Sequence, residues 1–232
     1  AVQAIRRGEP LSQTGLRGDT NGAAMRVCPV GLIHPGDVQG AARDAASSCI
    51  PTHNTHVAAS GAAAIAGAIA QALVPSSTLA DIIEAGKQAA REAMNWAAPW
   101  MGASVPRRIE LAVQLARGNK PARERLQDLY DIIGTTLAAS ESVPAAFGVI
   151  AMAEGDLMRT ATYAANLSGD ADTVGAMACA IIGAWRGKEV FPQALVAILK
   201  QTNPQFDFDG VAMGLYTLAA GLYPNEKGCE ED

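Results

Sequence analysis

The chain has 232 residues, of which 49% are hydrophobic and 18% charged, and its formal net charge is −5. This size allows one globular domain with ample core or two small ones, and we expect a single domain over 1–232. The negative net charge argues against a nucleic-acid-binding surface. Cysteines 28, 49, 179 and 229 include no Cys-x-x-Cys pair, so we expect a reducing, cytoplasmic setting without a disulfide framework. The first residues do not form a signal peptide.

The segment 57–74 carries no charge and is long enough to be tested as a membrane span. It consists mostly of alanine and glycine, includes Ser60 and Gln71, and lacks flanking aromatic residues. We therefore expect a buried helix here and no membrane association.

Helical sequence patterns, separated by helix-breaking residues, divide most of the chain into expected helices and short loops. Residues 1–16 are polar and suggest a loose start, 17–20 form a turn-rich loop, and 21–32 open a short helix of small residues. Further helices are expected over 35–49, 57–74, 76–96, 106–117, 122–133, 142–154, 156–167, 171–187, 191–202 and 208–222. Because no segment alternates with period two for long enough to form a strand, the expected class is all-α, a compact bundle of roughly ten helices.

Two carboxylates and a hydroxyl, Asp170, Asp172 and Thr173, stand at the start of a helix that is apolar on nearly every side. Such a helix packs inside a protein, so we expect these groups in a partly buried place. Positions i and i+2 of a helix point apart, and the carboxylates converge only if Asp170 precedes the helix. That arrangement presents oxygens to Mg²⁺, Ca²⁺ or Mn²⁺. Simple capping of the helix is the alternative interpretation.

The loop Asp19-Thr-Asn-Gly-Ala-Ala-Met-Arg26 is a second candidate for ligand contact. Its small residues let backbone N–H groups face a ligand, and the N-terminus of a following helix favours anions. Asn21 has a donor and an acceptor for a sugar hydroxyl or a phosphate. An Asn-Gly turn before a helix is the structural alternative.

These segments, with Thr52-His53 and Glu141-Ser-Val-Pro-Ala-Ala-Phe147, resemble the ADP-ribosylglycohydrolase family. Ser-Gly-Asp-Ala-Asp-Thr at 168–173, followed by Trp-Arg-Gly at 185–187, is similar to the metal motif of that family, and the loop around Asn21 is similar to its substrate loop. The resemblance covers about residues 14–224. Thr20 departs from the pattern, because the family usually has glycine there.

The resemblance implies Mg²⁺-dependent hydrolysis of a glycosidic bond between ADP-ribose and a protein side chain or small acceptor. Two Mg²⁺ ions, or Mn²⁺ in their place, would orient the ribose and a water molecule. It assigns Asp170, Asp172 and Thr173 to the metal, and it assigns residues of two loops to ADP-ribose: Gly18, Asp19, Thr20, Asn21, Gly22 and His53. The expected partners are ADP-ribose or an ADP-ribosylated protein, and the resemblance predicts no particular oligomeric state.

Members of that family begin with a further segment that holds a Gly-Asp pair, an acidic residue near the scissile bond and a Thr-Asp-Asp half of the metal site. No Thr-Asp-Asp occurs in this sequence. We therefore expect the family's N-terminal part to be missing and the catalytic acid or base to lie outside 1–232. The rival interpretation is a catalytically inactive ADP-ribose-binding or interaction protein with half a metal site.

A zinc site is a further alternative. Its candidate ligands are Cys28, His34, Cys49, His53 and His56. Their spacing matches no standard zinc pattern.

Overall fold

The computed structural model describes residues 1–223, and in this range short loops connect helices without any strand. Isolated bridges join Thr20 to Ala138 and Thr55 to Ala98. The predicted all-α class is therefore confirmed.

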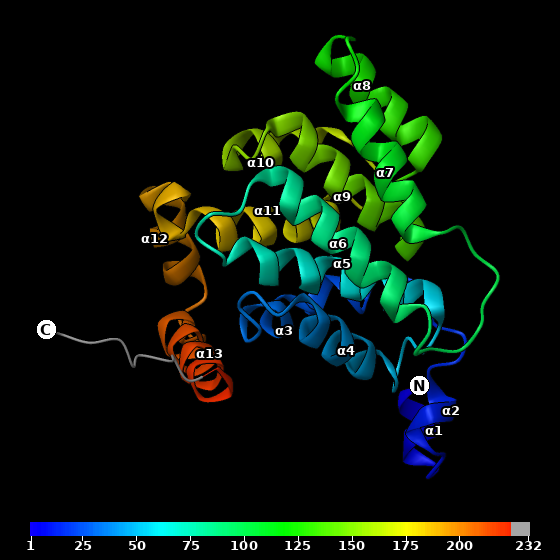
Figure 1. Cartoon of the computed structure of the whole chain (residues 1–232). Coiled ribbons are helices and arrows are strands. Elements are labelled where there is room, and N and C mark those ends of the chain that lie inside the picture. Colours follow the sequence, from blue (N-terminus) through cyan, green and yellow to red (C-terminus); the bar gives the residue numbers. More distant parts are fainter. Residues whose placement is uncertain (224–232) are drawn as a thin grey trace, which may run out of the picture.

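The elements follow one another as labelled in Figure 1. In chain order they are α1 (Val2–Arg6), α2 (Leu11–Thr14), the 3₁₀ turn η1 (Ala24–Arg26), α3 (Cys28–Leu32), α4 (Val38–Cys49), α5 (His56–Ala72), α6 (Leu79–Ala93), α7 (Val105–Ala116), α8 (Ala122–Asp128), the π turn η2 (Leu129–Ile133), α9 (Ala139–Ala153), α10 (Leu157–Asn166), α11 (Ala171–Arg186), the 3₁₀ turn η3 (Lys188–Val190), α12 (Gln193–Thr202) and α13 (Phe208–Leu222).

Helix α5 is the centre of the body, and every side chain from Val57 to Ala70 is buried. Its small side chains let α4 and α6 pack closely on it, and α3, α9 and α11 also contact it. Thr55 caps its start by accepting a hydrogen bond from the backbone N–H of Ala58. The uncharged segment is thus a buried helix, and none of the described helices has the length and hydropathy that a membrane span requires.

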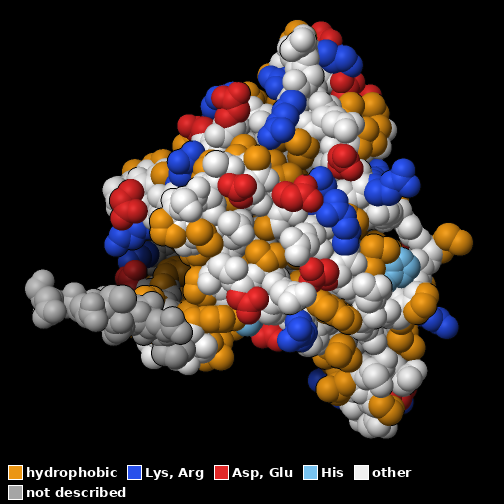
Figure 2. Space-filling model, in the orientation of Figure 1, with side chains coloured by type: hydrophobic (Ala, Val, Ile, Leu, Met, Phe, Trp, Pro, Cys, Tyr) orange, Lys and Arg blue, Asp and Glu red, His pale blue; other side chains and the backbone are white. Residues whose placement is uncertain are grey.

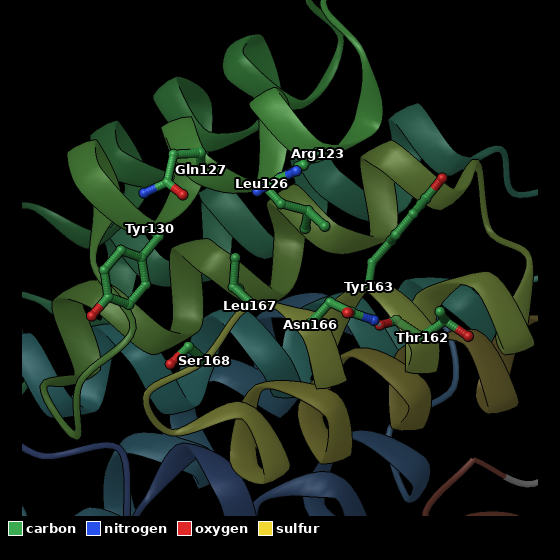
Figure 3. A pocket seen from close by; sticks show the side chains of 9 residues that line it. All are labelled: Arg123, Leu126, Gln127, Tyr130, Thr162, Tyr163, Asn166, Leu167 and Ser168. Carbon is green, nitrogen blue, oxygen red and sulfur yellow. Dashed lines mark hydrogen bonds between the residues drawn. The ribbon is translucent and has the colours of Figure 1, made fainter.

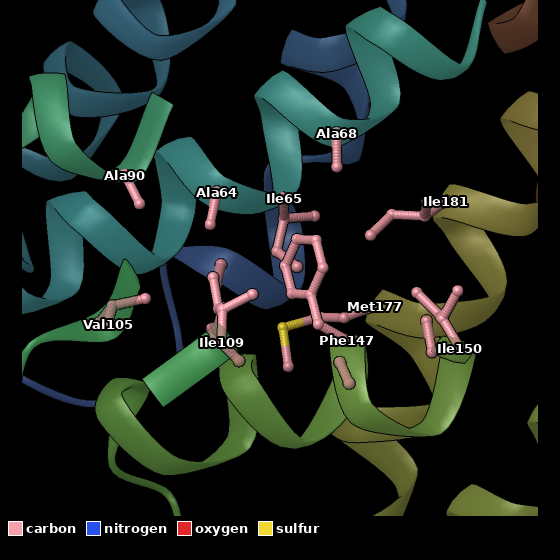
Figure 4. Close-up of a cluster of buried hydrophobic side chains, with 14 of the residues drawn as sticks. Ala64, Ile65, Ala68, Ala90, Val105, Ile109, Phe147, Ile150, Met177 and Ile181 are labelled. Atoms are coloured by element: carbon pink, nitrogen blue, oxygen red, sulfur yellow. The ribbon is translucent and has the colours of Figure 1, made fainter. Parts of the chain in front are cut away.

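The core between α5, α7, α9 and α11 consists of interdigitating aliphatic side chains around one aromatic ring (Figure 4). Phe147 projects from α9 toward Ile65 of α5 and is fully buried. Its ring lies directly over Gly86 of α6, where an added Cβ would stand 2.6 Å from the ring. This packing fixes α9, and with it the loop that leads into α9, against the rest of the body.

Helices α12 and α13 lie beside the body rather than within it (Figure 1). Many of their large apolar side chains remain exposed, including Leu195, Ile198, Val211, Met213 and Tyr216. A groove of about 530 Å³ separates part of α13 from α3 and the end of α5.

Tyr223 attaches the end of α13 to the body. Its hydroxyl donates to Asp37 Oδ2 (2.7 Å) and lies 2.5 Å from His34 Nδ1, while His34 Nε2 donates to Asp44 (2.9 Å). Burial and the contact with Asp37 raise the pKa of Tyr223 to about 12. The hydroxyl therefore remains protonated and able to donate at neutral pH.

Among the helix boundaries that differ from the sequence-based expectation, two lie near the candidate site. Helix α9 begins at Ala139 rather than at Ser142, so Pro144 lies in the second turn of the helix instead of the first. The helix expected over 122–133 ends at Asp128 and continues as the wider turn η2, which Gly134 closes with a φ of +83°. Both departures shape the segment 134–142, which lies beside the candidate site.

Candidate functional site

Three segments that are distant in sequence meet at the start of α11: the loop 18–22, the loop 134–142 and the turn 168–173. The first two run antiparallel beside one another, with Asn21 N–H donating to Leu137 O (2.8 Å) and Ala139 N–H donating to Asp19 O (3.0 Å). This pairing fixes the position of the Asn21 loop through backbone atoms.

The turn before α11 has an unusual backbone that places Asp170 at the helix start. Ser168 and Gly169 have φ values of +66° and +67°, in the left-handed region that disfavours most side chains. Asp170 N–H donates to Thr135 O (2.7 Å), and a Cβ added to Gly169 would stand 2.3 Å from Thr135 Oγ1. Glycine is therefore required at position 169, because this turn touches the loop 134–142 directly.

Both carboxylate oxygens of Asp170 accept hydrogen bonds from neutral side chains. Thr173 Oγ1 donates to Oδ1 (3.1 Å), and Asn21 Nδ2 donates to Oδ2 (2.5 Å). Asp170 precedes α11, but its side chain makes no capping bond to the helix backbone. The carboxylate is thus aimed at the Asn21 loop rather than at the N–H groups of its own helix.

Asp172 is placed differently from what the sequence pattern predicts. It is exposed, whereas Asp170 is half-buried and Thr173 is buried. Only one face of α11, which includes Val174, Met177 and Ile181, is fully buried. The charge of Asp172 therefore stays hydrated in the folded chain, and its carboxylate is accessible to a ligand.

Asn21 is almost completely buried, at 3% exposure, and its amide nitrogen makes two contacts inside the protein. Besides Asp170, Nδ2 donates to Ser142 Oγ (2.9 Å), and the Ser142 hydroxyl donates to Ala138 O (3.1 Å). Asn21 Oδ1 accepts no hydrogen bond from the described residues. Ser142 was not singled out from the sequence; the only indication was its place in the segment Glu141-Ser-Val-Pro.

His53 belongs to a chain of polar contacts that ends at Thr20. Arg26 Nη2 donates to Thr52 Oγ1 (2.8 Å), Thr52 Oγ1 contacts His53 Nδ1 (2.8 Å), and His53 Nε2 contacts Thr20 Oγ1 (3.0 Å). Since Thr52 can donate its proton to Nδ1, these contacts fit a neutral His53 that carries its proton on Nε2. Burial, and next the charge of Arg26, lower the pKa of His53, while Asp19 opposes the shift.

The remaining residues assigned to ADP-ribose adjoin this contact. A Cβ added to Gly22 would lie 2.9 Å from the His53 ring, so glycine allows the close approach. Asp19 accepts a hydrogen bond from Trp100 Nε1 (3.1 Å), and Gly18 O accepts one from Thr55 Oγ1 (2.6 Å). The structure thus brings together the six residues that the sequence analysis assigned to ADP-ribose.

The atoms at the start of α11 suit a hard cation but form only part of a coordination shell. Asp170, Asp172 and Thr173 offer oxygen donors, which Mg²⁺ and Mn²⁺ prefer. Within residues 1–223, no three His, Cys, Asp or Glu side chains are grouped as a metal site would require. The donor chemistry fits Mg²⁺, and water, substrate or other residues would complete the coordination.

The zinc alternative receives no support from the geometry, because within residues 1–223 no three His, Cys, Asp or Glu side chains lie close enough together to hold a metal ion. Burial raises the pKa of Cys28 and raises that of Cys49 to about 11. Cys229 lies outside the described residues.

A groove of about 610 Å³ reaches the same turn from another side (Figure 3). Residues of α8 and η2, including Arg123 and Tyr130, form one wall, and residues of α10, including Tyr163, form the other. Ser168, two positions before Asp170, lies at the end where Tyr130 is found (Figure 3).

The model of the ADP-ribosylglycohydrolase family matches residues 1–227. The chain belongs to this family. The resemblance drawn from four short segments is thereby confirmed over nearly the whole chain, and the all-α fold agrees with it. ADP-ribosylglycohydrolases hydrolyse glycosidic bonds and are known for a metal-dependent site.

Two curated proteins are similar to this chain. The uncharacterized protein YegU of Escherichia coli (strain K12) is 38% identical over 216 residues, which are 93% of this chain and 64% of YegU. An uncharacterized protein of Archaeoglobus fulgidus is 29% identical over 189 residues, which are 79% of this chain and 55% of that protein. The chain thus spans less than two thirds of the length of either relative, and neither description states a substrate.

Proposed function

We propose that this chain forms the substrate-binding and metal-binding part of a Mg²⁺-dependent hydrolase of ADP-ribosyl glycosidic bonds. The observation that carries the proposal is the hydrogen bond between Asn21 and Asp170. It joins the two segments whose sequence patterns point separately to ADP-ribose and to a divalent cation. A metal ion beside a sugar-binding loop can orient the ribose and activate a water molecule.

The loop 18–22 and His53 would hold ADP-ribose. Thr20 is exposed, and the proton on His53 Nε2 points at its hydroxyl, so this pair can offer hydrogen bonds to ribose hydroxyls or to phosphate oxygens. Asn21 has only Oδ1 left for a ligand, because its amide nitrogen is occupied by Ser142 and Asp170. A hydroxyl of the proposed ADP-ribosyl ligand could donate to this oxygen.

Asp170, Asp172 and Thr173 would bind Mg²⁺, or Mn²⁺ in its place. Thr173 donates its proton to Asp170, which leaves the lone pairs of its hydroxyl free for a cation. The exposed carboxylate of Asp172 adds a second negative charge. The bound ion would lower the pKa of a coordinated water molecule and orient the ribose.

The acidic residues beside the site have structural partners. Asp19 accepts a hydrogen bond from Trp100, and Glu141 accepts two from Thr136, from its backbone N–H (3.1 Å) and its hydroxyl (2.7 Å). We therefore retain the proposal that the catalytic acid or base comes from outside residues 1–232, in the segment with Gly-Asp and Thr-Asp-Asp that the family resemblance implies.

A second candidate function is binding of ADP-ribose without catalysis. It is favoured by the incomplete set of metal ligands among the described residues. In that case the same loop would serve recognition of ADP-ribose or of ADP-ribosylated proteins, and Mg²⁺ would contribute little.

The proposal is tested by two measurements on the 232-residue chain. Calorimetry with ADP-ribose, with and without Mg²⁺, should give binding that Mg²⁺ strengthens. ADP-ribosylated protein should be cleaved slowly by the chain alone and faster after addition of a family segment containing Gly-Asp and Thr-Asp-Asp, in cis or as a separate chain. Mg²⁺-independent binding with no cleavage in either form would favour the second candidate, and absence of ADP-ribose binding would contradict both.

The setting of this activity is also proposed rather than known. We propose the reducing cytoplasm, and the described cysteines Cys28, Cys49 and Cys179 are free thiols. Charged side chains of both signs are interspersed over the body in Figure 2, so the face shown there offers no broad positive patch to a nucleic acid.

A further inference from the structure

We infer that Asn21 and Ser142 are positioning residues that hold the carboxylate of Asp170 in the orientation needed to ligate a divalent cation. This inference deepens the proposed function and rests on it, because it takes Asp170 as a ligand of that cation. It changes the role expected for Asn21 from contact with substrate alone to support of the metal ligand.

The hydrogen bonds around Asn21 can run in only one direction. The Ser142 hydroxyl has one proton, which it donates to Ala138 O, so toward Asn21 it can act only as an acceptor. The ionised carboxylate of Asp170 also only accepts. Both contacts therefore require the amide nitrogen of Asn21, whose two protons they use completely, and a flipped amide would leave both acceptors without a donor.

Asn21 is itself held at both ends. Its backbone N–H donates to Leu137 O (2.8 Å), and its side chain is anchored by Ser142 in the first turns of α9. Ser142 is fully buried, so water does not compete for its contact. An amide held in this way can fix the rotamer of Asp170 across the interface between α9 and α11.

The two side chains that hold Asp170 orient its charge without neutralising it. Asn21 and Thr173 are both uncharged donors, and each binds a different carboxylate oxygen. A carboxylate has about four lone-pair positions, so each oxygen keeps one for a cation. A lysine or arginine in the place of Asn21 would instead compete with the metal ion. Arg26, the basic residue of this loop, is directed away and donates to Thr52 and Ser48.

The inference is tested by measuring Mn²⁺ affinity of the full chain from the electron paramagnetic resonance signal of free Mn²⁺. Ser142→Ala and Asn21→Ala should each lower the affinity about 10-fold or more, the range seen when outer-shell partners of a metal ligand are removed. Ser140→Ala is the matched control. Ser140 is also buried in the first turn of α9, and its hydroxyl is not part of this chain of contacts, so the affinity should stay that of the parent.

A double variant separates positioning from a general loss of structure. If Ser142 acts only through Asn21, Ser142→Ala should lower Mn²⁺ affinity no further in the Asn21→Ala background, whereas independent structural effects would multiply. Circular dichroism of each variant verifies that the helices are retained.

Asp170→Asn distinguishes failure of this inference from failure of the proposed function. No Mn²⁺ binding by the parent, or equal binding by parent and Asp170→Asn, would overturn the metal site itself. Binding that depends on Asp170 but is unchanged in Ser142→Ala and Asn21→Ala would overturn only the positioning role. Effects of the two substitutions that multiply in the double variant would show that Ser142 does not act through Asn21.

Discussion

The amide nitrogen of Asn21 donates a hydrogen bond to Asp170 Oδ2 across 149 positions of sequence. Its second proton goes to Ser142, so one side chain joins the first loop of the site, the start of α9 and the start of α11. Asn21 is thus a structural centre of the site as well as a candidate ligand contact.

Substitution of Asp170 and substitution of Asp172 should have different effects on Mg²⁺ affinity and on the free energy of unfolding. Asp172→Asn should lower Mg²⁺ affinity strongly while leaving the free energy of unfolding within about 0.5 kcal/mol, because Asp172 is exposed. Asp170→Asn should lower both, because its carboxylate accepts hydrogen bonds from Asn21 and Thr173. Calorimetry with Mg²⁺ and denaturant unfolding measure the two effects. Unchanged Mg²⁺ affinity in Asp172→Asn would remove that residue from the site.

Gly169→Ala should destabilise the chain by about 1–3 kcal/mol, the cost of a strained backbone position. Position 169 has a φ of +67°, and the added Cβ would collide with Thr135. Gly214→Ala is the control, because its added Cβ in α13 meets no atom within 4 Å. That substitution should stabilise α13 by up to about 1 kcal/mol. Urea unfolding of both variants tests the contrast, and equal stability would mean that the turn tolerates a side chain.

His53 predicts a pH dependence of stability with a definite sign. Its pKa in the folded chain lies below the ordinary 6.5, because burial and the charge of Arg26 disfavour the protonated ring. The unfolded chain therefore takes up this proton more readily, and the contribution of neutral His53 is complete above pH 6.5 and declines as the pH falls below it.

We expect the free energy of unfolding of the parent, minus that of His53→Gln, to decrease as the pH falls below 6.5. Nuclear magnetic resonance of the imidazole protons gives the titration midpoint directly. In Arg26→Gln the midpoint should rise, since a nearby positive charge is removed. A midpoint above 6.5 in the parent would contradict the contacts described for His53.

Tyr223→Phe should loosen α13, because the hydroxyl that contacts both His34 and Asp37 is removed. The expected loss is about 0.5–1.5 kcal/mol, the usual net value of a hydrogen bond. Hydrogen exchange should accelerate across 208–222. Tyr216→Phe is the matched control, since Tyr216 is 70% exposed. Equal exchange rates in the two variants would show that apolar contacts alone hold α13.

Local sequence signals predicted most of the helices. Thr78 and Asp81 form the capping box that starts α6, and α13 spans Phe208–Leu222 as expected, with Asp207 accepting from Gly210 N–H at its start. The start of α9 was predicted wrongly because proline usually marks the first turn of a helix. Pro144 lies one turn farther in, since pairing of Ala139 with Asp19 starts the helix earlier.

The site was predicted as a set of residues but not as an arrangement. The motifs around Asn21 and Asp170, whose small residues and carboxylates are visible in the sequence, predicted two loops that the structure places in contact. The role of Ser142 depends on a contact across 121 positions, which no local pattern encodes. Likewise, the exposure of Asp172 follows from which face of α11 is packed, and a helix that is apolar on nearly every side does not reveal that face.

The distance in sequence between Asn21 and Asp170 has a consequence for the order of events during synthesis. The ribosome must add 149 positions after Asn21 before Asp170 exists and can reach it. A divalent ion therefore cannot act as a nucleus around which α3 to α9 fold, as zinc does in a zinc finger. Any ligand of this site must wait until the start of α11 has left the ribosome, and depleting the ion during translation should leave the yield of folded protein unchanged.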